Sequence, residues 1–377
     1  MFPAHRPLSI TQTVSRSAGG DWTRSAIASL TAESEACVET PMFELPLPGL
    51  AHVRLLLKDE SVHPTGSLKH RLARSLFLYA LCNGRIGRGQ VVIDASSGST
   101  AISEAWFARR LGLPFIAVMP RTTAVAKQRE ITELGGRCEL VEPGEDATAR
   151  ARALARELDG CYLDQFGDAG SATDWRGNNN IAQSILDQCR DVGVGDPAWI
   201  VCGAGTGGTS TTLGRYLRYT GSAARLCVAE PTGAAFAQGW PSRDRSACAR
   251  QSTCIEGIGR PRVEPCFNFE LADAVIEVAD VASIAGAWSL EGWTGKRYGG
   301  SSGTNFVAAL QLASAMRAMQ LRGSIVMLLC DRGERYADTL FDPAWLKMQG
   351  FELGPWLERL EGIVRGAGAE VGTANGV

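Results

Sequence analysis

One lysine of this 377-residue sequence is placed where its amine could act as a nucleophile. Lys69 follows the loop Pro-Thr-Gly-Ser at 64–67, and an amphipathic helix is expected to begin at this lysine. The positive end of the helix dipole disfavours a protonated amine, and partial burial would disfavour it further. A neutral amine is what imine formation requires. Taken alone, however, Lys69 is more often a solvated lysine in a surface helix, beside His70 and Arg71.

A glycine-rich turn, CGAGTGGTST at 202–211, connects an apolar strand to a helix. Glycines let the backbone close around a phosphate, whose charge is then met by amides at the helix start. No Gly-Lys-Ser/Thr follows, so a nucleotide P-loop is excluded. Gly203, Gly205 and Gly208 do match GxGxxG, and Glu230 is a weak candidate for the acidic residue of a dinucleotide site. On this motif alone, a phosphate cradle, a dinucleotide site and a plain turn all remain open.

Four hydroxyl side chains gather in DASSGSTAISEA at 94–105, again where a strand runs into a helix. They are Ser96, Ser97, Ser99 and Thr100. Several hydroxyls and free amides at one helix start suit a carboxylate, whereas a helix cap needs only one such side chain. A nucleophilic serine is disfavoured, because GxSxG is absent and the sequence holds only four histidines.

The elements that must position these residues alternate between apolar strands and amphipathic helices. Nearly continuous apolar strands between helices predict an α/β fold of parallel sheets covered on both faces. Ligand loops in such folds lie at the carboxyl ends of strands, where these turns fall. We expect a smaller lobe over 51–165, a larger lobe from 1–50 and 166–365, and a disordered tail at 366–377.

Composition and charge disfavour several classes of protein. The net charge of −2 gives no reason to expect nucleic acid as a partner, and no run approaches the ~20 apolar residues of a membrane span. No histidine pairs with Cys or Glu at a ligand spacing, so no metal site is expected. Eleven cysteines without a CxxC pair suit reduced thiols in a cytoplasmic protein. The N-terminus lacks the apolar stretch of a secretory signal.

Taken together, the three segments resemble the fold type II pyridoxal-phosphate enzymes, the cysteine synthase and cystathionine β-synthase group with a tryptophan synthase β-like fold. PTGSLKHR at 64–71 resembles the segment that carries the family's cofactor lysine. SSGST at 96–100 resembles its substrate-carboxylate loop, and GTGGT at 205–209 its phosphate loop. Further matches, in the same order, are Gln165-Phe166, IEGIG at 255–259, SSGTNFVAAL at 301–310 and RGERYADT at 332–339. This order removes the dinucleotide interpretation.

The resemblance implies a role for each matching residue. Lys69 would hold pyridoxal 5′-phosphate as a Schiff base and act as the catalytic base. The other cofactor-binding residues would be Ser99, Gly205, Thr206, Gly207, Gly208, Thr209 and Ser301. The substrate would be bound by Ser96, Ser97, Gly98, Thr100 and Gln165. Two departures from the family are Ser99, where an asparagine is usual, and YGGSSG in place of GISSG. Ser301 then aligns with the serine that meets the pyridine nitrogen, and Ser302 is the alternative.

The subgroup that the sequence most resembles is the bacterial cysteine desulfhydrases, on the segments SSGST, HPTGSLKHRLARSL and DWRGNNNIA. The expected reaction is β-elimination on L-cysteine, which gives sulfide, pyruvate and ammonia. A neutral hydroxyl beside the pyridine nitrogen makes the cofactor a weaker electron sink, which suits elimination. A cysteine synthase-type transferase, using an O-acylated serine with sulfide or another thiol, stays open. A scaffold without activity is disfavoured by Lys69, and the resemblance also implies a homodimer.

Overall fold

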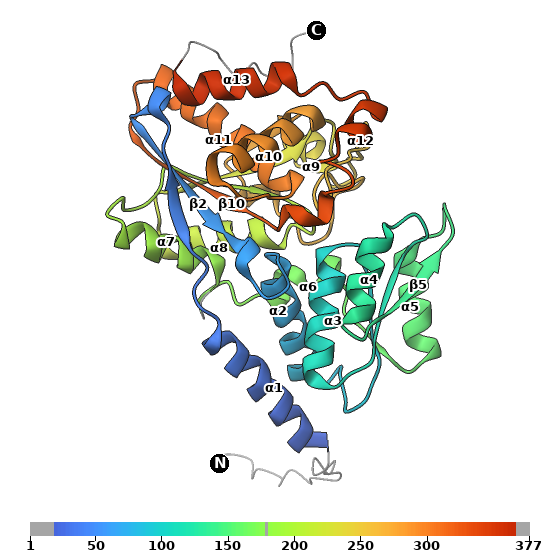
Figure 1. The fold of residues 1–377 in the computed structure, drawn as a ribbon. Coiled ribbons are helices and arrows are strands. Elements are labelled where there is room, and N and C mark those ends of the chain that lie inside the picture. The colour runs from blue at the N-terminus through green and yellow to red at the C-terminus, as the bar shows by residue number, and fades with distance from the viewer. Residues whose placement is uncertain (1–18, 178–179, 367–377) are drawn as a thin grey trace, which may run out of the picture.

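Two mostly parallel sheets, each covered by helices, form the two lobes of the computed structural model, which describes residues 19–177 and 180–366 (Figure 1). The larger sheet has the order β1 (Met42–Leu45), β2 (Val53–Asp59), β10 (Gly323–Leu329), β7 (Trp199–Gly203), β8 (Arg225–Pro231), β9 (Ala274–Val278). The smaller has the order β5 (Arg137–Val141), β4 (Phe115–Pro120), β3 (Val92–Ala95), β6 (Cys161–Tyr162). Among these pairings only β1 with β2 is antiparallel. The predicted α/β class is confirmed.

The helices cover both faces of both sheets. In the first half of the chain they are α1 (Gly19–Ala36), α2 (Lys69–Cys82), α3 (Ser99–Leu111), α4 (Val125–Glu133), α5 (Ala147–Glu157) and α6 (Gln165–Ala172). In the second half they are α7 (Ile181–Asp191), α8 (Gly208–Thr220), α9 (Ala235–Gly239), α10 (Asp280–Thr294), α11 (Gly300–Ala318), α12 (Pro343–Met348) and α13 (Gly354–Arg365). Short 3₁₀ helices span Pro48–Leu50 (η1), Glu60–Val62 (η2), Phe269–Leu271 (η3) and Gly333–Tyr336 (η4).

Strand β10 shows why the central strands are apolar at every position. Ile325 and Met327 belong to the hydrophobic cluster beneath α10 and α11, whereas Val326 and Leu328 belong to the cluster under α7 and α8. Successive side chains of a strand point to opposite faces, so a sheet covered on both faces buries every one of them. Each fully buried side chain of this size contributes about 2 kcal/mol to the hydrophobic stabilisation of the fold.

Helices α10 and α11 pack against each other at a contact that requires glycine. A Cβ atom on Gly303 would lie 1.9 Å from the carbonyl oxygen of Ser283, and one on Gly286 would lie 2.6 Å from the carbonyl oxygen of Gly303. The two backbones therefore meet directly. This contact places the N-terminus of α11, with Ser301, at the carboxyl end of the larger sheet.

The division between the lobes differs from the prediction at two places. Strand β2, assigned from sequence to the smaller lobe, lies in the larger sheet between β1 and β10. Its parallel partner β10 is about 270 residues later in the chain, so no local pattern could reveal this pairing. Helix α1, assigned to the larger lobe, packs on α2 and α3 of the smaller one. The predicted tail at 366–377 lies outside the described residues except for Gly366.

No helix among residues 19–177 and 180–366 is both long enough and apolar enough to cross a membrane. The eleven cysteines, all of which lie in these described ranges, are free thiols.

Candidate active site

A cavity of about 1030 Å³ lies between the two lobes, at the carboxyl ends of β3, β7 and β10. Almost every residue singled out from the sequence lines it. These are Lys69, Ser96, Ser97, Gly98, Ser99, Thr100, Gln165, Gly205, Thr206, Gly207, Thr209 and Ser301. Gly208 is the exception, and its amide donates to the Thr206 hydroxyl at 3.2 Å. The fold thus brings together three motifs that lie far apart in the sequence.

Lys69 begins helix α2, as expected, and its amine faces the glycine-rich loop. Its Nζ lies 3.8 Å from the position that a Cβ atom on Gly205 would take. The pKa of this amine is lowered, because burial disfavours its charged form. The thiol of Cys330 and the carboxyl of Asp331 act in the opposite direction and raise the pKa. The preceding residue is fastened to the end of β10, since the Leu68 amide donates to the Cys330 carbonyl at 2.8 Å. A neutral amine is therefore accessible at this position.

The glycine-rich loop is shaped by close backbone contacts. A Cβ atom on Gly205 would lie 2.1 Å from the carbonyl oxygen of Gly257, so only glycine fits there. Gly207 caps helix α8 with φ +83°, a left-handed conformation that favours glycine. The first residues of α8, Thr209 and Ser210, line the cavity. A helix N-terminus that opens onto a cavity in this way suits a phosphate group.

Two of the four hydroxyl side chains around the start of α3 have protein partners. The Ser96 hydroxyl accepts from the amide of Ala101 at 3.2 Å, which is a capping contact. The Ser99 hydroxyl donates to Asp331 Oδ2 at 3.3 Å and accepts from Arg335 at 3.1 Å. Ser99, where the family usually has asparagine, thus connects the smaller lobe to the end of β10.

The cavity contains a buried carboxyl that the sequence reasoning missed. Asp331 follows β10 directly, and its Oδ2 accepts from the hydroxyl of Tyr336 at 2.7 Å. Burial raises the pKa of Asp331 and of Tyr336. The segment RGERYADT was noticed as a match, but Asp331 immediately precedes it. Its position just after a predicted strand could have marked Asp331 as a candidate site residue, because ligand-binding loops lie at the carboxyl ends of strands.

The two serines that start α11 have different surroundings. Ser301 lines the cavity, and a hydrogen bond joins it to the thiol of Cys330. Ser302 is fully buried, and its hydroxyl accepts from the Cys330 amide at 2.8 Å. Of the two alternatives left by the sequence, Ser301 is the one that faces the cavity.

Gln165 begins helix α6 and is held from behind. Its Nε2 donates to Asp94 Oδ2 at 3.0 Å and to the carbonyl of Ala95 at 3.1 Å. With its amide nitrogen used in this way, Gln165 offers the cavity the acceptor Oε1. A direct hydrogen bond to a substrate carboxylate would require the amide to turn.

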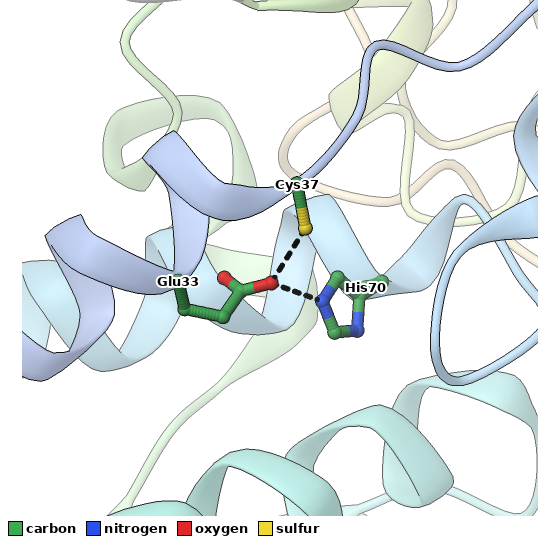
Figure 2. A group of neighbouring side chains, drawn as sticks. All are labelled: Glu33, Cys37 and His70. Carbon is green, nitrogen blue, oxygen red and sulfur yellow. Dashed lines mark hydrogen bonds and ion pairs between the residues drawn. The ribbon is translucent and has the colours of Figure 1, made fainter.

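Glu33, Cys37 and His70 form a separate cluster, where α1 meets α2 (Figure 2). Glu33 Oε1 accepts from the Cys37 thiol at 2.8 Å and pairs with His70 Nε2 at 3.0 Å. Their ligand atoms lie within 4.8 Å of one another, as in some metal sites. Arg74 already binds both oxygens of Glu33, however, and a guanidinium there would repel a cation. We interpret the cluster as a contact that fastens α1 beside Lys69.

Comparison with known proteins agrees with this geometry. Residues 34–331 match the family described as pyridoxal-phosphate dependent enzyme. The chain is 50% identical to the L-cysteine desulfhydrase Cds1 of Mycobacterium tuberculosis, across 89% of this chain and 93% of the relative. The chain belongs to the pyridoxal-phosphate dependent enzyme family.

Two further similar proteins are more distant in sequence. An N-(2-amino-2-carboxyethyl)-L-glutamate synthase of Cupriavidus metallidurans is 30% identical, across 83% of this chain and 90% of the relative. The crystal structure of a hydrogen sulfide-producing enzyme from Fusobacterium nucleatum superimposes with a TM-score of 0.74 at 25% identity, covering 84% of this chain and 92% of that one. This pyridoxal-phosphate dependent enzyme therefore has the fold type II architecture that its motifs indicated.

The residues around the cavity fit pyridoxal 5′-phosphate, the cofactor that membership of the family implies. The Lys69 amine is lowered in pKa, as a Schiff-base lysine requires. The loop through Gly205 and Gly207 has no room for a Cβ atom at either position, and it leads into the N-terminus of α8. A cradle for a phosphate therefore faces a reactive amine across one cavity.

Proposed function

We propose that this enzyme converts L-cysteine and water into sulfide, pyruvate and ammonia by β-elimination. The observation that carries the proposal is the position of the Lys69 amine, which faces the phosphate-type loop inside the cavity. Two likenesses support it. A relative with the name L-cysteine desulfhydrase is 50% identical over 341 residues, and a hydrogen sulfide-producing enzyme has a similar structure.

Pyridoxal phosphate, when bound, withdraws electrons from the α carbon of an amino acid and so acidifies its α proton. Lys69 would act as the base that takes this proton. Burial lowers the pKa of its amine, so the amine is neutral at a lower pH than that of a free lysine. Loss of the α proton and departure of the β thiol then give sulfide. The cavity lies between two lobes, and this position limits the access of water to the reacting atoms.

The surrounding residues would hold the two molecules in place. We assign the cofactor's phosphate to the loop 205–209, and its pyridine nitrogen to Ser301. Ser99 would lie beside the ring, held by Asp331 and Arg335. The substrate's carboxylate would meet the start of α3 at 96–100, where the helix dipole favours negative charge. Gln165 would not bind the carboxylate directly in this orientation; its Nε2 would hold the carbonyl of Ala95 and so position the loop 96–100.

The alternative is a β-replacement reaction of the cysteine synthase type. It is favoured by the relatives at 28% to 30% identity that are named as synthases. The transferase would use an O-acylated serine with sulfide or another thiol.

Incubating the holoenzyme with L-cysteine alone, while measuring sulfide and pyruvate together, separates these reactions. We expect equal amounts of both products, and a loss of at least about a thousandfold in rate for Lys69→Ala. Lys347→Ala is the control, since Lys347 is exposed on α12 and does not line the cavity. Sulfide without pyruvate would favour the transferase. Neither product would overturn the cysteine assignment.

We further propose that the enzyme is a cytoplasmic homodimer. The free state of all eleven cysteines supports a reducing compartment. The homodimer is an expectation from the family resemblance, and light scattering of the purified holoenzyme would test it.

A further inference from the structure

Two buried carboxyl groups lie behind the substrate-carboxylate loop, and neither was among the predicted site residues. Asp94 lies in strand β3 and Glu104 in helix α3, and both side chains are 0% exposed. The two carboxyl groups are close enough to share a hydrogen bond. Three of their four oxygens, Asp94 Oδ1 and both oxygens of Glu104, have no N–H or O–H donor. A bond between two carboxyl groups requires that one of them carry a proton.

The charges around the pair disfavour a second negative charge. Asp164 and the phenol of Tyr162 face Asp94 from the end of β6, and Cys161 lies near them. Two guanidinium groups lie on this side of the pair: Arg152, on α5, binds Asp164 at 2.9 Å and lies over the Tyr162 ring, and Arg85 donates to the carbonyl of Tyr162 at 2.6 Å. Asp94 is the titratable group that acts on Glu104. Two buried carboxylates without a direct cation cannot both be ionised near neutral pH.

Asp94 in turn connects this pair to the cavity. Its remaining oxygen, Oδ2, accepts the Nε2 hydrogen of Gln165 at 3.0 Å. The same Nε2 donates to the carbonyl of Ala95, the residue just before the loop 96–100. A hydrogen bond to a charged acceptor is stronger than one to a neutral acceptor. An ionised Asp94 therefore holds Gln165 and the end of β3 more firmly than a protonated Asp94 would.

We propose that Glu104 is a positioning residue whose proton, shared with Asp94, keeps Asp94 as the acceptor that orients Gln165 and the substrate-carboxylate loop. The inference rests on the proposed function, since it concerns how that site holds an amino-acid carboxylate. Glu104 does not touch the cavity. It acts through Asp94, and it is the donor that stabilises the charge on Asp94.

The pair makes substrate binding dependent on pH in a definite direction. Burial raises the pKa of Asp94 to about 6 and that of Glu104 well above its usual value. Above about pH 6, Asp94 is ionised, Glu104 is protonated, and the hold on Gln165 is complete. As the pH falls through 6, Asp94 takes up a proton and the hold weakens. KM for L-cysteine should therefore rise on the acid side, whereas kcat changes less.

Two variants of Glu104 test whether this residue acts as a hydrogen-bond donor to Asp94 or only fills the space beside it. Glu104→Leu removes the donor, so the pKa of Asp94 should rise, and the increase in KM should begin about one pH unit higher than in the wild type. Glu104→Gln keeps a donor without a titrating group, so its KM profile should stay close to that of the wild type. If Glu104→Leu does not fold, Asp94→Asn replaces it, and we expect its KM to lose the acid-side rise altogether.

The infrared spectrum provides a readout that needs no turnover. In a difference spectrum of wild type against Glu104→Gln, near neutral pH, we expect the carbonyl band of a protonated carboxyl group to appear in the wild type only. Absence of this band would overturn the shared proton. An unchanged KM profile in Glu104→Leu, or equal shifts in the Leu and Gln variants, would overturn the positioning role. If the holoenzyme did not consume L-cysteine, the proposed function would fail, whereas the infrared result would still decide the proton.

Discussion

The space around Gly205, close to Lys69, is too small for one added methyl group. The loop at 205–209 approaches Gly257 so closely that one methyl group on Gly205 would collide with its carbonyl. The Lys69 amine lies 3.8 Å from the position of the same methyl group. Steric changes at this residue therefore affect the proposed phosphate site and the reactive amine together.

We predict that Gly205→Ala weakens binding of pyridoxal phosphate by about tenfold or more, because overpacking by one methyl group costs ~1–3 kcal/mol. Titration of the apoprotein, followed by the cofactor's absorbance, measures this. Gly292→Ala is the matched control, since nothing lies within 4 Å of its added Cβ atom and its helix α10 should gain up to about 1 kcal/mol. Equal cofactor affinity in the two variants would contradict the prediction.

At the scale of elements, α1 is fastened to α2 by the buried cluster around Glu33. Burial alone would raise the pKa of Glu33, but hydrogen bonds from His70, Arg74 and Cys37 outweigh it and lower the pKa to about 2. His70 is the neighbour of Lys69, and its other ring nitrogen lies 3.2 Å from the hydroxyl of Thr65 in the loop before the lysine. The cluster therefore supports the segment that carries the reactive amine.

We predict that Glu33→Gln lowers the free energy of unfolding by about 3 kcal/mol, because it leaves Arg74 buried without its carboxylate. Urea denaturation near neutral pH measures this. Asp21→Asn is the control on the same helix, since the pair of Asp21 with Arg24 is highly exposed and should contribute almost nothing.

The same cluster should make stability depend on pH. The pKa of Glu33 is lower in the folded chain than in the unfolded chain, so its contribution is fully present above about pH 4.5 and is lost as the pH falls toward 2. The difference between wild type and Glu33→Gln should therefore shrink over that range. A difference that stayed constant from neutral pH down to about pH 3 would show that Glu33 is not a charged partner of Arg74.

On the scale of the whole molecule, the two lobes are joined across the mouth of the cavity. Lys127, on α4 of the smaller lobe, forms an ion pair with Glu256 of the larger lobe, and both residues line the cavity. Nearby, Arg335 binds Glu130 of the same helix at 3.1 Å. Helix α4 is thus held to the larger lobe by two ion pairs.

We predict that Glu256→Gln raises KM for L-cysteine about threefold, with little change in the free energy of unfolding, because one partly exposed ion pair contributes only ~0.2–1 kcal/mol. Steady-state kinetics of sulfide release measures this. Glu142→Gln is the matched control, since Glu142 pairs with Arg121 within the smaller lobe. If both variants behaved alike, the ion pair across the mouth would have no part in substrate binding.

The parts of the site that are built from contiguous residues could be predicted from the amino-acid sequence. The lysine after PTGS, the glycine loop at 205–209 and the hydroxyl loop at 96–100 are short motifs with demands that are local: a helix start, a backbone without Cβ atoms, several donors in a row. Continuous apolar strands likewise indicated sheets covered on both faces. For this reason the fold class and the cavity-lining residues could be predicted without coordinates.

Only the tertiary structure decided which residues support these motifs. Ser99 meets Asp331 across 232 positions of the chain, Gln165 meets Asp94 across 71, and β2 pairs with β10 across about 270. Such pairings leave no periodic signal, because their partners are set by where the strands end in space rather than by neighbours in the chain. The same holds for Glu104, which reads as one polar position of an amphipathic helix until the fold buries it against a second carboxyl group.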